Sequence, residues 1–119
     1  MNAGPPVVAV LGLGEAGSAI AADLVAAGAA VRGFDPQVRP GPGVTACAGD
    51  ADACRGAAVV VSLTCAHEAE GALVAALHGV GPAAIYADLN TASAEAKVRL
   101  AGLAETAGVA FADAVFRSA

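Results

Sequence analysis

Short runs of aliphatic residues alternate along this chain with longer stretches in which apolar residues recur every three or four positions. Runs of about four to eight aliphatic residues are typical of strands buried in a parallel sheet, whereas the longer spacing is typical of helices with one apolar side. We predict strands at residues 7–11, 30–34, 44–47, 59–63, 84–88 and 109–112, of which 44–47 has the weakest pattern. Helices are predicted at residues 16–27, 50–55, 66–78 and 94–107.

This alternation of strand and helix predicts an α/β fold. A helix between two consecutive strands returns the chain through a right-handed crossover, so the strands pair in parallel. We expect a doubly wound, mainly parallel sheet of about six strands with helices on both faces. A length of 119 residues is typical of one domain, so residues 1–119 are predicted to form a single domain.

Glycines and capping residues support these boundaries. Gly28 and Gly108 follow predicted helices, where glycine readily takes the left-handed conformation that ends a helix. Asp50 and Ser93 stand at predicted helix starts, where a side-chain oxygen can accept hydrogen bonds from the first free N–H groups.

Composition narrows the environments and partners that this chain can have. Hydrophobic residues make up 57% of the chain and aromatic residues only 3%, so the core must consist mainly of small aliphatic side chains. No apolar run approaches the roughly 18 residues needed to span a bilayer, and the N-terminus lacks the basic region of a signal peptide. We therefore expect a soluble, cytoplasmic protein. A net charge of -5 argues against nucleic acid or an anionic membrane as partner.

The cysteines do not form a pattern typical of a metal site. Cys47, Cys54 and Cys65 show no Cys-x-x-Cys spacing and have no histidine at the offsets of a zinc ligand set. We predict no bound metal and expect these residues to be buried or half-buried thiols.

A glycine-rich segment follows the first predicted strand. Gly12, Gly14 and Gly17 form a Gly-x-Gly-x-x-Gly pattern between that strand and the first helix, as in the dinucleotide-binding turn of a Rossmann fold. The first glycine permits the tight turn, the second lets the backbone approach a pyrophosphate, and the third lets the helix pack against the strand. The loop residues expected to contact the cofactor are Gly12, Leu13, Gly14, Glu15, Ala16 and Gly17.

Asp35 ends the second predicted strand and bears on the choice of cofactor. It follows Gly12 by 35 − 12 = 23 positions, close to the separation of about 20 at which an acidic residue binds the adenosine ribose hydroxyls. A carboxylate there would repel the 2′-phosphate of NADP, so the sequence favours NAD. Arg39, close behind in a proline-rich loop, could instead reach a 2′-phosphate, which keeps NADP as the alternative.

Two alternatives to a dinucleotide site stay open. The glycines could serve only a tight turn and close packing, with Asp35 a solvated strand end. S-adenosylmethionine sites also combine a glycine-rich first loop with an acidic residue after the second strand. Their loop commonly has an acid before the first glycine, where this chain has Leu11.

With these residues placed, the chain resembles the N-terminal cofactor domain of the β-hydroxyacid dehydrogenase superfamily, which includes 3-hydroxyisobutyrate and 6-phosphogluconate dehydrogenases. The strongest similarity lies in residues 10–17 and 33–36. It extends over nearly the whole chain through residues 59–64 and 87–94.

The resemblance implies further site residues after two later strands. In that family the loop after the fourth strand, matched here by Leu63 and Thr64, passes the cofactor. The polar residues matched by Asn90 and Thr91 approach the nicotinamide and the substrate. Capping of the next helix is the alternative role of Asn90 and Thr91. Ala94 replaces the family's usual proline, a departure that concerns helix entry.

Similarity is weaker after the last predicted strand. Asp113 and Ala114 match the family's substrate-binding segment, whereas Val115, Arg117 and Ser118 do not. Arg117 could pair with a substrate carboxylate or phosphate, although a residue so near the end of the chain is more often solvated.

The family's catalytic lysine lies in a C-terminal helical domain, for which this sequence has no matching segment. We therefore expect no catalytic residue here: Lys97 is predicted to lie on the surface, and His67 and His78 match no catalytic position. The resemblance implies the NAD(P)-binding domain of an oxidoreductase that transfers hydride between a nicotinamide cofactor and a small β-hydroxy acid, similar to hydroxyisobutyrate or phosphogluconate. Alone, it is expected to be inactive and to self-associate. The alternative is a free-standing dinucleotide-binding or sensing module without catalysis.

Overall fold

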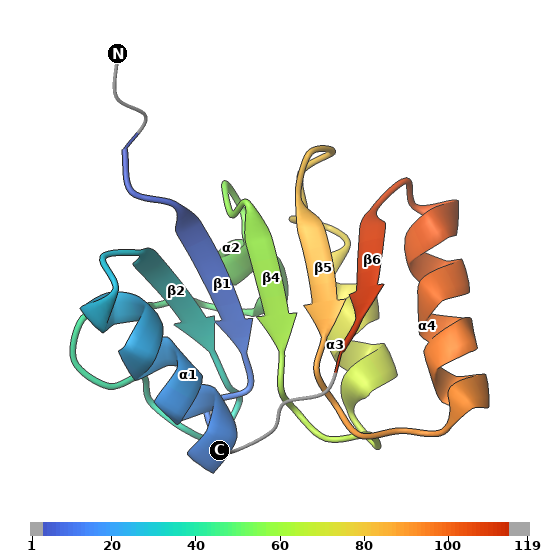
Figure 1. Ribbon diagram of the computed structural model, residues 1–119, viewed down its shortest axis with the longest axis horizontal. Coiled ribbons are helices and arrows are strands. Elements are labelled where there is room, and N and C mark those ends of the chain that lie inside the picture. The colour runs from blue at the N-terminus through green and yellow to red at the C-terminus, as the bar shows by residue number, and fades with distance from the viewer. Residues whose placement is uncertain (1–3, 115–119) are drawn as a thin grey trace.

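The computed structural model describes residues 4–114 and contains ten regular elements within them (Figure 1). In chain order they are β1 (Val7–Leu11), α1 (Glu15–Ala26), β2 (Ala30–Phe34), β3 (Val44–Ala46), α2 (Asp50–Cys54), β4 (Val59–Ser62), α3 (Ala69–Ala76), β5 (Ile85–Asp88), α4 (Ala94–Thr106) and β6 (Ala110–Asp113). No helix among the described residues is both long enough and apolar enough to cross a membrane.

The strands form one sheet in the order β3-β2-β1-β4-β5-β6, and every neighbouring pair is parallel. The chain winds outward from β1 to β3, returns to β4 beside β1, and then winds outward on the other side. This reversal confirms the predicted doubly wound Rossmann fold. The carboxyl ends of β1 and β4, where the strand order reverses, are the usual ligand position in such sheets.

Helices cover the sheet unequally (Figure 1). On one face, α1 packs through Ala21 against Val10 and Val31. On the other, α2, α3 and α4 pack against a cluster that includes Val60 and Tyr86. Alanines make up much of that second cluster, including Ala53, Ala69, Ala76 and Ala104, and they surround the buried ring of Tyr86.

All the predicted strands and helices are present, and their ends differ by at most three residues. α3 begins at Ala69 and not at residue 66, because residues 66–68 form a turn. Gly28 and Gly108 follow α1 and α4 with φ angles of +96° and +75°, as predicted. Ser93 caps α4, since its Oγ accepts a hydrogen bond from Ala96 N at 3.1 Å.

Three sequence-based expectations about individual side chains are wrong. Asp50 does not cap α2: Gly49 is the N-cap and Asp50 is the first helical residue. Cys65 is exposed, because it lies in the loop after β4, whereas Cys54 is buried and Cys47 is half-buried. Lys97 is buried, because it lies on the inward side of α4, one turn before the core residue Leu100.

Candidate functional site

The carboxyl ends of β1, β4 and β5 lie side by side and bring three predicted site segments together. Backbone bonds keep their ends level: Leu63 N donates to Leu11 O at 2.8 Å, and Leu89 N donates to Ser62 O at 3.0 Å. The glycine turn, the loop at residues 63–64 and the segment at residues 89–91 therefore emerge at one edge of the sheet.

Packing explains two of the three glycines in the turn. Gly12 has a φ angle of +93°, and a Cβ atom there would lie 2.3 Å from Leu63 O. A Cβ atom on Gly17 would lie 1.8 Å from Gly12 O, on backbone that cannot move aside cheaply. Gly14 differs, because a Cβ atom there would have no heavy atom within 4 Å. The turn is closed by Gly12 and Gly17 and stays open at Gly14.

The open position is also the start of α1. Gly14 is the N-cap and supplies no side-chain cap to the first N–H groups of the helix. Such N–H groups, with the helix dipole, favour an anion in front of them. The exposed carboxylate of Glu15 in the first turn works against that attraction. Leu13, between the glycines, is buried, and its carbonyl accepts a hydrogen bond from Ser18 Oγ at 2.7 Å.

Asp35 connects the glycine turn to the loop after β2. Its Oδ2 accepts from Leu13 N at 2.8 Å, while Oδ1 accepts from Gln37 N at 2.8 Å and Val38 N at 3.1 Å. Asp35 is half-buried. The alternative that Asp35 is only a solvated strand end is therefore wrong, because its carboxylate holds the glycine turn and the loop after β2 in place.

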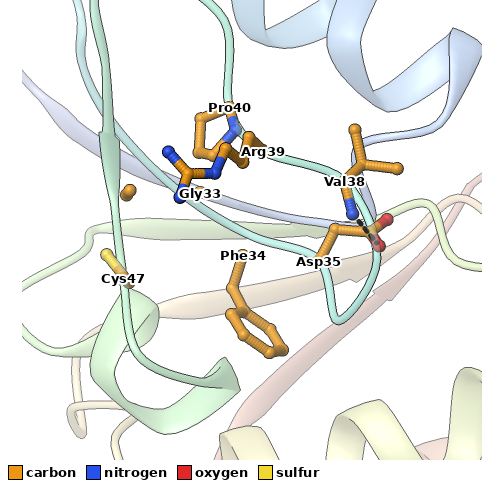
Figure 2. Close-up of a pocket in the computed structure, with 8 residues that line it drawn as sticks. Gly33, Phe34, Asp35, Val38, Arg39, Pro40 and Cys47 are labelled. Atoms are coloured by element: carbon orange, nitrogen blue, oxygen red, sulfur yellow. Dashed lines mark hydrogen bonds between the residues drawn. The ribbon is translucent and has the colours of Figure 1, made fainter.

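A cavity of about 390 Å³ adjoins Asp35. It is lined by Gly33, Phe34, Asp35, Val38, Arg39, Pro40, Ala46 and Cys47. Figure 2 shows the Arg39 guanidinium directed toward Gly33 and Cys47, away from the Asp35 carboxylate, which is turned toward Val38. The salt bridges among residues 4–114 include neither Asp35 nor Arg39. An anion and a cation thus lie at opposite sides of one hollow.

Asp50, predicted only as a cap, adds a second carboxyl group at this edge. Burial raises its pKa, and the nearby charge of Asp35 raises it further. Its spacing from the glycines matches no motif, so this proximity could not be predicted without the fold.

The segment after β5 is held by buried polar contacts. Asn90 is 4% exposed, and its Nδ2 donates to Asp88 Oδ2 at 3.1 Å and to Ser62 Oγ at 3.3 Å. Thr91 is exposed. The capping role considered for Asn90 and Thr91 is wrong, because Ser93 caps the helix.

Lys97 joins this segment from α4. Its Nζ lies 2.8 Å from Asp88 Oδ1 and 2.8 Å from Asp113 Oδ1. Burial by itself lowers the pKa of Lys97, but hydrogen bonds to the two carboxylates and their negative charges outweigh it, so the pKa is raised. The lysine remains a cation and neutralises charge at the ends of two strands.

Three more residues considered in the sequence, Leu63, Thr64 and His67, lie between β4 and α3. Leu63 and Thr64 are half-buried beside Gly12, and Thr64 Oγ1 donates to Cys65 O at 3.2 Å. His67 is exposed in the turn before α3. Arg117, proposed to bind substrate, lies outside the described residues, as do Val115 and Ser118.

Comparison with solved structures finds the same architecture in several oxidoreductases. A Mycobacterium tuberculosis 3-hydroxyisobutyrate dehydrogenase with L-serine matches with a TM-score of 0.86 and 30% identity, over 96% of this chain and 41% of that one. An imine reductase variant from Myxococcus stipitatus with NAD⁺ matches with a TM-score of 0.80 and 16% identity, over 93% of this chain and 40% of that one. The Myxococcus stipitatus imine reductase with NADP⁺ gives 0.79 and 14%, over 92% and 40%.

This chain thus spans about two fifths of the length of these proteins. A search of curated proteins found no match. The family model described as the NAD binding domain of 6-phosphogluconate dehydrogenase matches residues 7–115, nearly the whole chain. With the parallel sheet and the glycine turn, this match confirms the resemblance inferred from the sequence: the chain belongs to the family of 6-phosphogluconate dehydrogenase NAD-binding domains.

Proposed function

We propose that residues 1–119 form the dinucleotide-binding domain of an oxidoreductase that transfers hydride between a nicotinamide cofactor and a small β-hydroxy acid. The observation that carries this proposal is the glycine turn, which is closed by packing at Gly12 and Gly17, open at Gly14, and hydrogen-bonded to Asp35. A turn needed only for packing would not require glycine at the open position.

The described residues fit a dinucleotide. The open space at Gly14 and the uncapped start of α1 suit a pyrophosphate, and the hollow beside Asp35 suits an adenosine. When bound, the nicotinamide ring would supply the hydride acceptor or donor. The residues proposed to hold the cofactor are Gly12, Leu13, Gly14, Glu15, Ala16, Gly17, Asp35, Leu63, Thr64 and Asn90.

We propose NAD as the preferred cofactor. Asp35 contributes a carboxylate beside the cavity, and Asp50 adds a second acidic group nearby. Both would repel a 2′-phosphate. Arg39 is the opposing group on the cavity wall, but its guanidinium is directed away from Asp35 in Figure 2.

The proposed substrate class rests on similarity. The Mycobacterium tuberculosis dehydrogenase structure contains L-serine, which is itself a β-hydroxy acid. Asn90 and the exposed Thr91, at the carboxyl end of β5, are the proposed substrate-binding residues, together with Arg117. We propose that this domain is inactive alone, because Lys97 is engaged with two carboxylates and is not available as a general acid or base.

Titration with NADH and NADPH, followed by nicotinamide fluorescence, tests the proposal in a chain that contains no tryptophan. NADH is expected to bind more tightly than NADPH. Gly14→Ala should abolish binding while the protein stays folded, because its Cβ would enter only the open space. Gly102→Ala is the matched control: it also faces open space, but within α4, and should leave binding unchanged.

Each outcome bears on a separate part of the proposal. Failure of both dinucleotides to bind would overturn the dinucleotide site. Equal or tighter binding of NADPH would overturn the assignment to Asp35. Oxidation of a small β-hydroxy acid by this chain alone would overturn its proposed inactivity.

A free-standing binding or sensing module is the second candidate, favoured by the same engagement of Lys97. This candidate predicts that the chain binds a dinucleotide but supports no turnover, even when a catalytic domain is fused to it. Supplying a helical catalytic domain from a relative, fused after residue 119, distinguishes the two: restored turnover supports the oxidoreductase.

We also propose that the domain pairs with a second copy of itself through a part of the sheet that no helix among residues 4–114 covers. On the face covered by α1, the apolar residues Val59, Ile85 and Ala110 lie side by side in register across β4, β5 and β6. Ile85 is 45% exposed there. Sedimentation should detect a dimer that Ile85→Ser weakens, and a monomer at all concentrations would contradict this proposal.

A further inference from the structure

A buried ion cluster lies at the carboxyl ends of β5 and β6, next to the proposed nicotinamide end of the site. Asp88 is 0% exposed and Lys97 is 8% exposed, which is unusual for charged residues. Lys97 Nζ also donates to Asp88 O at 3.2 Å, in addition to its carboxylate contacts. The cluster therefore anchors α4 to the last residue of β5.

Three donors face the Asp88 carboxylate, and Lys97 is the charged one among them. Asp88 Oδ1 accepts from Lys97 Nζ at 2.8 Å and from Asn90 N at 3.0 Å. Asp88 Oδ2 accepts from Asn90 Nδ2 at 3.1 Å. An ionised carboxylate has no proton to donate, so every group that faces Asp88 must be a donor.

This requirement determines which way the Asn90 amide faces. Its NH₂ group must face Asp88, where it also reaches Ser62 Oγ. Its carbonyl oxygen, Oδ1, must then face elsewhere, and no donor among residues 4–114 bonds to it. The reverse orientation would set two oxygen acceptors against each other.

We propose that Lys97 is a positioning residue: through Asp88 it holds the Asn90 amide in one orientation, which presents Oδ1 to the nicotinamide half of the dinucleotide. This inference rests on the proposed function, because it needs a nicotinamide cofactor at this edge. The ligand groups recognised by Oδ1 are donors, such as a ribose hydroxyl or the carboxamide NH₂ of the nicotinamide.

The test compares two ligands by isothermal titration calorimetry. NADH carries the nicotinamide riboside, whereas ADP keeps the adenosine and the diphosphate but lacks both the second ribose and the nicotinamide. Lys97→Met should weaken NADH binding by about threefold to tenfold, the effect of one lost hydrogen bond. The binding of ADP by the same variant should change by less than about twofold, because ADP has no group for Oδ1 to contact.

Two further variants keep the test informative when Lys97→Met folds poorly. The double variant Asp88→Asn with Lys97→Met removes both charges, so neither is left buried alone, and it should show the same selective loss. Leu100→Ala is the stability control, because Leu100 also lies on the inward side of α4 and belongs to the apolar core cluster. It should lower the melting temperature without changing the ratio of the two affinities.

The outcomes separate this inference from the proposed function. When the wild-type chain binds neither ligand, the dinucleotide site itself is wrong, and the inference fails with it. When the wild type binds both but the variants lose both equally, or lose neither, the site stands and the role of Lys97 is wrong. Selective loss of NADH in both cluster variants supports the inference.

Discussion

The two ends of the carboxyl edge of this sheet are built in different ways. At β1 and β2 the candidate site consists of backbone, closed by glycines and tied by Asp35 to neighbouring N–H groups. At β5 and β6 it consists of buried side chains, in which Lys97 balances Asp88 and Asp113. The first depends on the absence of Cβ atoms and the second on a balance of charge, so different substitutions should break them.

The largest expected effect is at the backbone end. In Gly17→Ala, the Cβ atom would lie 1.8 Å from Gly12 O, so the strand and helix must separate. We expect a loss of more than about 4 kcal/mol in the free energy of unfolding. This loss far exceeds the roughly 1 kcal/mol by which alanine stabilises a helix interior relative to glycine. Urea denaturation measures this loss, and a variant as stable as the wild type would contradict the packing of the turn.

At the side-chain end, Lys97→Met should cost about 3 kcal/mol, because it leaves Asp88 buried without its cation. This cost is at the lower end of the range for breaking a buried ion pair, because the lysine side chain is still 9% exposed. The double variant Asp88→Asn with Lys97→Met should recover most of the loss, because no charge stays buried. A double variant less stable than Lys97→Met would show that the charges are not coupled.

Alkaline pH should weaken the side-chain end gradually. The pKa of Lys97 is raised, so its stabilising contribution is present below the unfolded pKa of about 10.4 and is lost as pH rises through the folded value. Burial also raises the pKa of Cys54 to about 12, so the unfolded state ionises first and stability falls from about pH 8.5 upward. Urea midpoints between pH 8 and pH 11 should therefore decrease.

Two substitutions separate these contributions to alkaline unfolding. Cys54→Ala should remove most of the decrease that begins near pH 8.5, the ordinary pKa of a thiol, and Cys47 contributes the rest because burial also raises its pKa. The double variant at Asp88 and Lys97 should reduce the part above about pH 10, to which Tyr86 also contributes because burial raises its pKa. Midpoints that stay constant or rise over this range would contradict both assignments.

The smallest expected effect is at Tyr86, in the core below the ion cluster. Its hydroxyl is the buried side-chain polar atom that lacks a hydrogen-bond partner among the described residues. Tyr86→Phe removes that unpaired group and keeps the ring stacked on Phe111, with centroids 6.2 Å apart. We expect stability to stay within about 0.5 kcal/mol or to rise by about 1 kcal/mol. A loss above about 1.5 kcal/mol would mean that the hydroxyl is hydrogen-bonded.

The sequence predicted the backbone end well, because its signals are local. Gly12, Gly14, Gly17 and the following acidic residue lie in one strand, turn, helix and strand unit, so spacing alone identifies them. The side-chain end was predicted poorly. Lys97 was expected on the surface, since nothing near it in the sequence shows that Asp88 and Asp113 become its neighbours.

Hydrophobic periodicity and the glycine spacing by themselves determined the order of elements, the parallel sheet and the position of the turn, because strand burial and helix entry are local properties of the chain. Tertiary structure alone decided that the ends of β5 and β6 meet over α4, which turns a lone lysine into a buried cation. It also decided that Gly14 faces open space while Gly17 faces the backbone of Gly12. A motif can identify glycines, but only packing separates those that close the turn from the one left open to a ligand.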